Sequence, residues 1–429
     1  MTNKKYFEID DPLVERAVLV GVDRSDPLWS LEESLAELER LANTAGAEVV
    51  ACTSQKLESP HPKTFIGAGK AEEVAKLCTT FDADVVIFDD ELSPSQQTNL
   101  ERIVPKKVKV IDRTALILDI FALHATSKEG RLQVRLAQNE YLLPRLRGMW
   151  AHLAANRMGG GVGSRFGEGE SQLEVDRRMV RKRITTIKRE LKHLSDVRTI
   201  QRDGRYQSGV FKVALAGYTN AGKSSLLNFM TEAEVLSYDK LFATLDSTTR
   251  KYVLPEGREI TLTDTVGFIQ KLPTTLVEAF KSTLDEIVGA DLLLHIIDAS
   301  STEYEAQIVA VDTVLQQINA HHISRVEVFN KIDLLEAEAL EAIKLRHRDA
   351  IFISALSGEG TESLVAHIAR IAAARDEHME VCIPYNRGDL VSLIHERCSI
   401  VSEEHSDQGT CITMLVNEQY ANLFSPYKV

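Results

Sequence analysis

The fold is decided by one stretch of this 429-residue chain, Phe211-Lys212-Val213-Ala214-Leu215-Ala216 followed by Gly217-Tyr218-Thr219-Asn220-Ala221-Gly222-Lys223-Ser224. The first six residues predict a buried strand, and Ser225–Phe229 predicts the start of a helix. The eight residues between them fit the phosphate-binding pattern G-x-x-x-x-G-K-[ST]. A strand, a glycine turn and a helix N-terminus form the geometry that this pattern requires, so a chance match explains the stretch poorly. The sequence therefore predicts a nucleotide-phosphate site.

Parts of this loop have separable chemical roles. Gly217 and Gly222 allow backbone N–H groups to converge on phosphate oxygens, and the helix N-terminus adds partial positive charge. Lys223 is expected to neutralise the β- and γ-phosphates, and the Ser224 hydroxyl is expected to ligate Mg²⁺. Ser225 completes the set of predicted phosphate-side contacts.

A second motif, Asp264-Thr265-Val266-Gly267, follows the predicted strand Glu259–Thr263. A carboxylate at Asp264 can hold a water in the Mg²⁺ shell, and the Gly267 N–H can contact the γ-phosphate and sense its loss. Taken alone, D-x-x-G is a weak signal, because any junction of strand and turn could supply it. It nevertheless lies 40 residues after Ser224, in the expected chain order.

Two further motifs concern the base. Asn330-Lys331-Ile332-Asp333 follows the strand Val326–Phe329, and Ser354-Ala355-Leu356 follows Ala350–Ile353. The Asp333 carboxylate can accept hydrogen bonds from N1–H and the 2-amino group of guanine, whereas adenine offers neither donor. Such a mismatch discriminates by roughly 10⁴-fold. The Lys331 stem can cover the purine, Asn330 can brace the loop, and a backbone N–H near Ser354 can meet the guanine O6. Four motifs at successive strand ends predict a GTP site with Mg²⁺.

The chain is expected to be an α/β protein in four parts. Residues 1–126 alternate short apolar runs, such as Ala17–Val22 and Val85–Phe88, with helical patterns, which predicts a small parallel α/β domain. The other three predicted parts are a basic helical hairpin with a glycine-rich loop over 127–208, a P-loop GTPase domain over 209–375 and a short α+β piece over 376–429. Within the hairpin, the six glycines of Arg157–Gly169 predict a loop without regular structure.

Charge is unevenly distributed along the chain. The formal net charge is −13, which argues against general coating of nucleic acid. Residues 127–205 contain 18 Lys+Arg and 9 Asp+Glu, so this stretch carries +9 and the rest carries −22. We therefore expect one basic module attached to acidic ones.

Other features indicate a cytoplasmic protein. The apolar run around Leu292–Ile297 is broken by His295 and ends at Asp298, far short of the ~18 residues of a membrane span. The N-terminus has no apolar stretch behind its lysines and predicts no secretory signal. The five cysteines are scattered and without metal-ligand spacing, which favours reduced thiols. No stable insertion into a membrane is expected.

With these motifs, the chain resembles the HflX family of translational GTPases over nearly its whole length. The resemblance is carried by GYTNAGKS (217–224), FATLD (242–246), DTVGF (264–268), NKID (330–333), SAL (354–356), RMGGGVGSRFGEGE (157–170) and the basic helix that follows.

The resemblance implies a role for each part. It makes Thr244 the switch threonine and the second Mg²⁺-ligating side chain beside Ser224, although the residues alone leave Thr244, Thr248 and Thr249 as equal candidates. The implied nucleotide contacts of this segment are Phe242, Ala243, Thr244, Leu245 and Asp246, and the implied catalytic groups are Lys223, Thr244 and Gly267. It also implies a protein that hydrolyses GTP to GDP, binds the large ribosomal subunit and its rRNA, and dissociates or rescues stalled ribosomes under stress. We expect the protein to be a monomer.

One position departs from the wider GTPase pattern. Phe268 follows Gly267, where many GTPases carry a glutamine that orients the attacking water, and phenylalanine has no donor or acceptor. Hydrolysis is therefore expected to be slow unless the ribosome or another group completes the site. In related GTPases an asparagine placed like Asn220 helps to bind K⁺, so Asn220 either recruits K⁺ or only caps the loop.

Two further features stay open. The helix after the glycine loop presents Arg178, Lys182, Arg189 and Lys192 largely on one side, and Arg157 and Arg165 lie in the loop itself. These six residues are the candidate RNA contacts, with a merely solvated charged face as the alternative. The other feature, Gly67-Ala68-Gly69-Lys70, is an incomplete phosphate loop for which a plain turn is favoured, and the family leaves weak ATPase activity there as a second possibility.

Three readings of the whole chain follow. The first is an enzyme-switch in which GTP favours the ribosome-bound form and hydrolysis releases it. The second is a GTP-gated RNA-binding factor whose hydrolysis is incidental. A P-loop kinase is the poorest reading, because it gives no role to the guanine-specifying motif at Asn330–Asp333.

Overall fold

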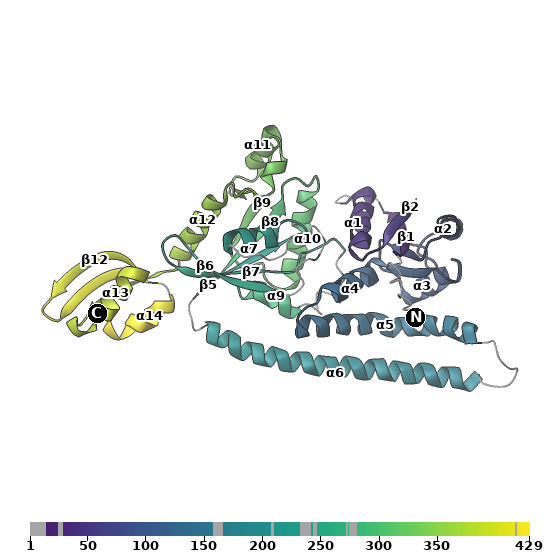
Figure 1. Ribbon diagram of the computed structural model, residues 1–429, viewed down its shortest axis with the longest axis horizontal. Helices are drawn as coiled ribbons and strands as arrows, with labels where there is room; N and C mark the ends of the chain where they lie inside the picture. Colours follow the sequence, from purple (N-terminus) through teal and green to yellow (C-terminus); the bar gives the residue numbers. More distant parts are fainter. Residues whose placement is uncertain are drawn as a thin grey trace, which may run out of the picture. The chain divides into compact units, whose positions relative to one another are not determined.

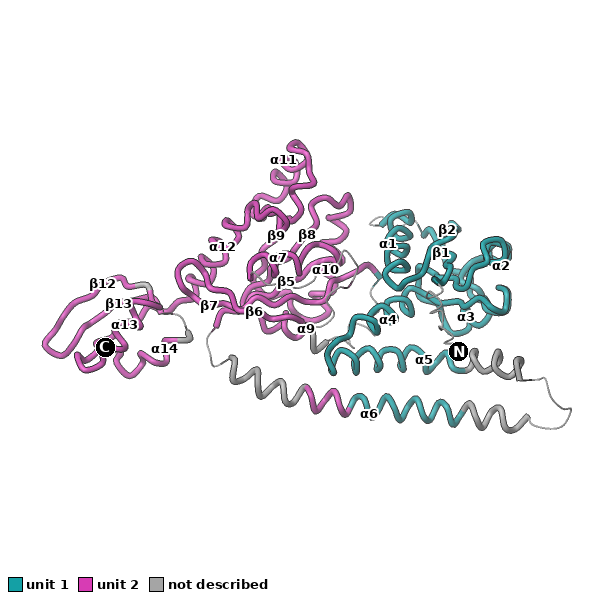
Figure 2. Tube along the Cα trace, in the orientation of Figure 1, with its two compact units in different colours: residues 1–188, 271–276 teal, residues 189–270, 277–429 magenta. Residues whose placement is uncertain are grey.

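The computed structural model describes residues 14–24, 29–157, 166–206, 210–231, 242, 247–271, 273, 281–416 and 418–429. The chain divides into two compact units (Figure 2). Unit 1 comprises residues 1–188 and 271–276, and unit 2 comprises residues 189–270 and 277–429. Most helices and many strands of the two units are labelled in Figure 1. No helix among the described residues is long and apolar enough to span a bilayer.

Unit 1 contains a four-stranded parallel sheet in the order β2-β1-β3-β4. Its strands are β1 (Arg16–Asp23), β2 (Glu48–Lys56), β3 (Val85–Phe88) and β4 (Lys109–Asp112). Its crossover helices are α1 (Leu31–Thr44), α2 (Ala68–Thr80) and α3 (Pro94–Glu101), with α4 (Arg113–His124) after the last strand. The buried strand residues share a core with α2, which includes Val18, Val86 and Val74. Burial on both faces explains why these strands read as continuous apolar runs.

Local signals place the helix starts in unit 1. The Ser30 side chain accepts a hydrogen bond from the Glu33 N–H and caps α1. Ser93 and Gln96 form a reciprocal capping box at α3. The sequence did not predict α4, because its residues from Leu116 to Phe121 are buried nearly all round and so show no helical period.

Two long helices follow, α5 (Lys128–Arg157) and α6 (Phe166–Tyr206). Lys188 of α6 pairs with Glu140 of α5 at 2.8 Å, as expected for neighbouring arms of a hairpin. The prediction of a structureless stretch over Arg157–Gly169 is wrong at both ends, since α5 continues to Arg157 and α6 already begins at Phe166. Helical hydrogen bonding along α6 outweighs the cost of its two early glycines. Residues 158–165 lie outside the described part.

Unit 2 contains a six-stranded sheet in the order β10-β9-β8-β5-β7-β6, and only β6 runs antiparallel to its neighbour. Its strands are β5 (Phe211–Gly217), β6 (Thr248–Val253), β7 (Glu259–Asp264), β8 (Leu292–Asp298), β9 (Arg325–Asn330) and β10 (Ile351–Phe352). Its helices are α7 (Lys223–Thr231), α9 (Lys281–Val288), α10 (Tyr304–Gln317), α11 (Ala337–Arg346) and α12 (Thr361–Ala373). The predicted α/β class is confirmed. Since β5 and β7–β9 are parallel, their carboxyl ends meet at one edge of the sheet.

The last part of unit 2 is a small antiparallel sheet of order β11-β13-β12. Its elements are β11 (Glu377–Ile383), α13 (Gly388–Arg397), β12 (Ser399–Ser406), β13 (Gly409–Val416) and α14 (Glu418–Phe424), with 3₁₀ turns η2 (Tyr385–Arg387) and η3 (Ser425–Tyr427). It has its own core, which includes Val381, Ile394 and Phe424. The division of the chain at residues 126, 208 and 375 remains a prediction.

The small sheet corrects the expectation about cysteines. Cys382 and Cys411 lie directly opposite each other on β11 and β13, with Cα atoms 4.0 Å apart, and form a disulfide. The described free thiols are Cys52, Cys78 and Cys398. Sequence spacing gave no sign of this pair, because the two residues are 29 positions apart and meet only through strand register.

Candidate nucleotide-binding site

The phosphate-binding loop joins the buried end of β5 to the N-terminus of α7. Gly222 has a φ of +92°, and a Cβ there would lie 2.1 Å from the Asn330 side-chain nitrogen. Only glycine therefore fits this position, both for its backbone conformation and for the closeness of its neighbour. The turn leaves backbone N–H groups at a helix N-terminus, which is the arrangement that binds phosphate.

Lys223 is already held in a position that serves a phosphate. Its Nζ donates to the carbonyls of Gly217 at 3.1 Å and Tyr218 at 2.9 Å. An ammonium group has three N–H donors, so this geometry leaves one to meet a ligand. Burial lowers the pKa of Lys223 to about 8, against the opposing effect of the Asp264 carboxylate. A desolvated cation of this kind favours an anionic ligand.

The predicted magnesium ligand Ser224 lies against Asp264, the carboxylate predicted to hold a water of the magnesium shell. Ser224 Oγ donates to Asp264 Oδ2 at 2.6 Å, and Asp264 is 1% exposed. Mg²⁺ commonly takes one or two protein oxygens and completes its shell with phosphates and water. A hydroxyl at the helix start and a carboxylate at the end of β7 therefore fit Mg²⁺ bound with a nucleotide.

The turn after β7 packs directly against the phosphate loop. A Cβ at Gly267 would lie 2.9 Å from the Thr219 Cα and 3.1 Å from Lys223 Nζ, so no side chain fits there. The Thr219 N–H donates to the Phe268 carbonyl at 2.7 Å, and the Phe268 N–H donates to the Gly217 carbonyl at 3.1 Å. The Thr265 hydroxyl donates to the Leu215 carbonyl at 2.7 Å, and Val266 is buried. Gly267 thus lies beside Lys223, the group predicted to meet the γ-phosphate.

Asn330 joins three of the predicted motifs. Its side-chain nitrogen donates to the Ala221 carbonyl at 2.8 Å, and its side-chain oxygen accepts from the Ala355 N–H at 2.9 Å. The residue is 2% exposed. A single buried amide therefore joins the phosphate loop and the loop after β10 to the base loop, the segment Asn330–Asp333.

The residues predicted to contact the base differ in their exposure to solvent. Asp333 lies in the exposed 3₁₀ turn η1 (Ile332–Leu334), and Ile332 is buried beneath it. Ser354 is fully buried, and Leu356 is 86% exposed. Since Ala355 donates its N–H to Asn330, Leu356 is the better placed of the two to offer a backbone N–H to guanine O6.

The sequence analysis did not identify Asp298 as a residue of the candidate site. Asp298 Oδ2 accepts a hydrogen bond at 2.6 Å from Nζ of the predicted residue Lys331, which has a φ of +65°. Asp298 ends β8, the strand beside β9, and its carboxylate fixes the end of the lysine side chain, whose stem is predicted to cover the base. An acidic residue at the carboxyl end of an apolar strand was the available signal.

Several predicted residues lie outside the described part. Phe242 is described and buried, with a φ of +59°. The neighbouring predicted contacts Ala243, Thr244, Leu245 and Asp246 are not described, so the candidate switch threonine is not placed. Arg165 is also outside the described residues, and for Arg157 only the backbone, at the end of α5, is described.

Asn220 has a free side chain in this part of the structure. It is exposed, has a φ of +62°, and makes no hydrogen bond to any described residue. The alternative in which its side chain caps the loop therefore finds no contact to support it.

The candidate RNA contacts on α6 are accessible. Arg178, Lys182, Arg189 and Lys192 are all exposed, and none forms an ion pair with a described residue. Cations that do not pair within the chain remain available to an anionic partner.

The incomplete phosphate loop of unit 1 is engaged internally. The Gly67 N–H donates to Gln55 at 2.9 Å, and Lys70 donates to Thr53 at 3.2 Å and Glu73 at 2.9 Å. The groups that would meet a phosphate are thus bonded within the domain. ATPase activity of this region stays an untested prediction.

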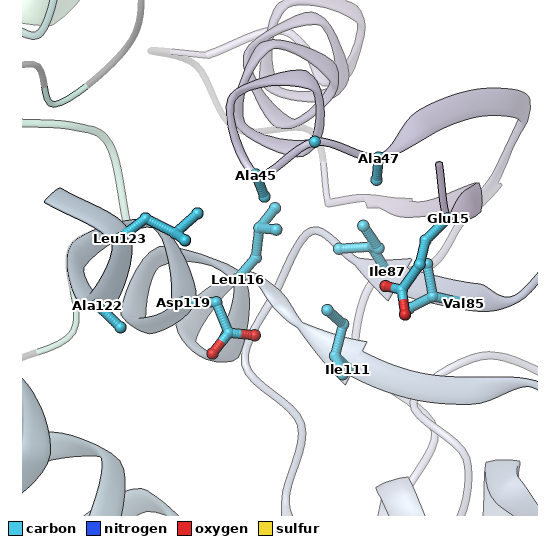
Figure 3. A pocket seen from close by; sticks show the side chains of 11 residues that line it. Glu15, Ala45, Ala47, Val85, Ile87, Ile111, Leu116, Asp119, Ala122 and Leu123 are labelled. Atoms are coloured by element: carbon cyan, nitrogen blue, oxygen red, sulfur yellow. The ribbon is translucent and has the colours of Figure 1, made fainter. Parts of the chain in front are cut away.

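Unit 1 also has a cavity of about 510 Å³ between α1, α4 and the sheet (Figure 3). Val85, Ile87, Ile111 and Leu116 give it an apolar floor, and Glu15 and Asp119 supply carboxylates. Burial, followed by the charge of Glu15, raises the pKa of Asp119. Among the described residues, no lysine or arginine lines this cavity, so it does not suit a nucleotide phosphate.

Comparison with known proteins finds three consecutive matches to family models between residues 32 and 331. Their descriptions are GTP-binding GTPase N-terminal over residues 32–122, GTP-binding GTPase Middle Region over 124–205, and 50S ribosome-binding GTPase over 212–331.

Full-length relatives are similar over most of the sequence. GTPase HflX of Caldanaerobacter subterraneus subsp. tengcongensis is 46% identical over 398 residues, which are 93% of this chain and 90% of the relative. GTPase HflX of Magnetococcus marinus is 43% identical over 88% of this chain and 87% of its own. GTPase HflX of Escherichia coli K12 is 43% identical over 380 residues, which are 88% of each chain.

The geometry predicts a strong effect at Asn330. Asn330→Ala leaves the Ala221 carbonyl and the Ala355 N–H without their partner. Each buried group without a partner lowers the free energy of unfolding by about 1–3 kcal/mol. We expect the Kd for guanine nucleotide to rise at least about tenfold and the unfolding temperature to fall. Asn330→Asp keeps the acceptor for Ala355 but places a buried carboxylate against the Ala221 carbonyl, so its effect should be at least as large as that of Asn330→Ala. Titration calorimetry and thermal unfolding measure both quantities.

The matched control is Gln317→Ala, which removes an exposed side-chain amide from α10 of the same unit. Equal affinities for the Asn330→Ala variant, this control and the unmodified protein would contradict the assigned role of Asn330.

Proposed function

The chain belongs to the HflX family of GTPases, and from this premise we propose that its GTP cycle controls binding to the large ribosomal subunit and thereby the dissociation or rescue of stalled ribosomes under stress. The family membership makes the chain a GTP-binding GTPase. The observation that carries the rest is the convergence of the phosphate loop, the Gly267 turn and the base loop at one sheet edge, linked by Lys223 and Asn330. Such a site binds a nucleotide and registers whether its γ-phosphate is present.

Guanine selection is assigned to Asp333. Its exposed carboxylate at the rim of the base loop is free to accept from two guanine N–H groups, while Lys331, held by Asp298, covers the ring. Adenine would leave this acceptor unmatched. The preference for guanine therefore rests on a single carboxylate whose loop is fixed by Asn330.

Asp333→Asn should exchange the base preference. An amide cannot accept from both N1–H and the 2-amino group, so the Kd for GTP should rise by about 100-fold or more. The same amide can donate to the 2-oxo group of xanthine, so xanthosine triphosphate should gain affinity. Competition against a fluorescent nucleotide measures both changes, with the exposed Glu338→Gln as control. Unchanged GTP affinity, or no gain for xanthosine triphosphate, would remove Asp333 from this role.

Hydrolysis is proposed to proceed through positioning and charge compensation. The chain's own groups are Lys223 for the phosphates, the Gly267 amide for the γ-phosphate and the Ser224 hydroxyl for Mg²⁺, with Thr244 as the proposed switch threonine. Bound Mg²⁺ would neutralise charge that develops on the β- and γ-phosphates. Phe268 is 2% exposed and apolar, so it cannot orient the attacking water. We therefore propose a slow intrinsic rate that an added cation or the ribosome raises.

Potassium is the proposed added cation. The unengaged Asn220 side chain at the phosphate loop can offer its oxygen to K⁺, which would supply positive charge where a catalytic arginine is otherwise used. GTP turnover should be at least about tenfold faster in KCl than in NaCl of equal ionic strength. Asn220→Ala should abolish that difference while leaving GDP affinity within about twofold. Identical turnover in the two salts rules out the potassium proposal.

The ribosomal partner is supported by two observations. The family model that matches residues 212–331 is described as a 50S ribosome-binding GTPase. In addition, the exposed cations of α6 suit RNA phosphates, in a chain that is otherwise acidic. We place the action of the protein in the cytoplasm, where ribosomes are found.

Co-sedimentation with ribosomal subunits tests this partner. The protein should pellet with large subunits under a non-hydrolysable GTP analogue and largely dissociate under GDP. The double variant Arg178→Gln/Lys182→Gln should bind more weakly and reduce the slope of log Kd against log salt by up to about 2. Lys251→Gln/Arg348→Gln changes the same charge at exposed positions of unit 2 and should bind normally. Equal binding under the analogue and GDP would contradict nucleotide control.

A GTP-gated RNA-binding factor with incidental hydrolysis is the second candidate, favoured by the apolar, buried Phe268. The two readings differ in the need for hydrolysis. If the non-hydrolysable analogue permits normal recycling from the large subunit, the second reading is correct.

A further inference from the structure

Tyr218 belongs to the phosphate loop, but its side chain contacts the turn that follows β7. The residue is buried, and its Oη accepts a hydrogen bond from the Gln270 N–H at 2.7 Å. Both residues lie in unit 2, so the contact is internal to one compact unit. Gln270 stands three residues after Gly267, the residue proposed to sense the γ-phosphate. The tyrosine therefore joins the loop that holds the phosphates to the chain just beyond the proposed sensor.

Backbone hydrogen bonds hold the same segment along the phosphate loop. The Phe268 N–H donates to the Gly217 carbonyl at 3.1 Å. The Thr219 N–H donates to the Phe268 carbonyl at 2.7 Å. Tyr218, which lies between the two loop residues, thus forms an isolated parallel bridge with Phe268. The chain after Gly267 is therefore fastened to the loop by its backbone and by the tyrosine hydroxyl together.

The pairing of β5 with β7 is interrupted around Gly267. It ends at Leu215 and Asp264, and it resumes at Tyr218 and Phe268. From 215 to 218 the loop takes three steps, whereas from 264 to 268 the turn takes four, so the turn carries one extra residue, as in a β-bulge. An extra residue of this kind changes the direction of the backbone locally. Gly267 is the last residue of the turn before pairing resumes.

This turn brings Gly267 against groups of the phosphate loop and helix α7. A Cβ there would lie 2.9 Å from the Thr219 Cα and 3.1 Å from Lys223 Nζ. Before the glycine, the Thr265 hydroxyl holds the turn by donating to the Leu215 carbonyl at 2.7 Å. After the glycine, the two backbone hydrogen bonds and the tyrosine hydroxyl hold it. Of these last three bonds, the tyrosine bond is made by a side chain, so a substitution can remove it while the backbone bonds remain.

We propose that Tyr218 is a positioning residue whose hydroxyl, by accepting from the Gln270 N–H, holds the Gly267 turn in place for the γ-phosphate of GTP. This inference rests on the proposed nucleotide-sensing role of Gly267. Because the hydrogen bond restricts the turn before the nucleotide arrives, less conformational freedom is lost when the Gly267 N–H meets the γ-phosphate. GDP has no γ-phosphate, so its affinity should not depend on the tyrosine hydroxyl.

The test removes the hydroxyl from the full-length chain and keeps the ring. Tyr218→Phe retains the packing of the buried ring and loses the acceptor for the Gln270 N–H. Tyr304→Phe is the matched control, because it removes the hydroxyl of another buried tyrosine of unit 2, which lies on α10 and donates to Glu305 at 3.3 Å. Titration with a fluorescent non-hydrolysable GTP analogue and with the corresponding GDP gives the ratio of the two Kd values for each variant. Hydrogen exchange of the Gln270 amide, measured without nucleotide, reports on the hydrogen bond itself.

Tyr218→Phe should raise the Kd for the analogue about fivefold, as expected for the loss of one ordinary hydrogen bond, while the Kd for GDP changes by less than about twofold. The Gln270 amide should exchange at least about fivefold faster in this variant. Tyr304→Phe should keep both the ratio of Kd values and the exchange rate of the unmodified protein.

Three results overturn the inference: an unchanged ratio of Kd values in Tyr218→Phe, a ratio shifted in favour of the analogue, or an equal loss of affinity for both nucleotides, which would indicate a structural role alone. A separate result bears on the proposed function. If residues 265–270 of the unmodified protein exchange equally fast with the analogue and with GDP, the proposed nucleotide sensing by Gly267 is refuted.

Discussion

The hydrogen bonds of one buried amide, that of Asn330, hold the candidate site together. Because this side chain donates to the phosphate loop and accepts from the loop after β10, the position of the base loop is fixed relative to both. The pairing of β9 with β10 ends at Phe329, so the Asn330 amide holds the loops together beyond that point. Selection of the base and binding of the phosphates are therefore coupled through a single residue that itself carries no charge.

The same edge of the sheet gathers the charged groups. Lys223 is desolvated and partly satisfied by loop carbonyls, Asp264 is bonded to Ser224, and Asp298 holds Lys331. Each ionic group is oriented by a neighbour on a different element of the same unit, which limits reorganisation when a ligand binds.

The sequence predicted the parts of this protein that local patterns control. Strand β3 has the bounds expected for it, and the strands before Gly217, Asp264 and Asn330 lie where the motifs required them. The sequence did not predict helix α4, because the helix is buried on nearly every side and lacks the polar face that gives a helical period. The sequence also did not predict the role of Asp298 or the Cys382–Cys411 pair, because each depends on which strands become neighbours and not on nearby sequence.

Binding of GTP and ATP to the full-length chain tests the central claim most directly. Titration calorimetry in Mg²⁺ should show GTP bound by a 1:1 site at least about 10³-fold more tightly than ATP, because only guanine satisfies the Asp333 carboxylate. Equal affinity for the two nucleotides, or no binding of either, would contradict the account of this site.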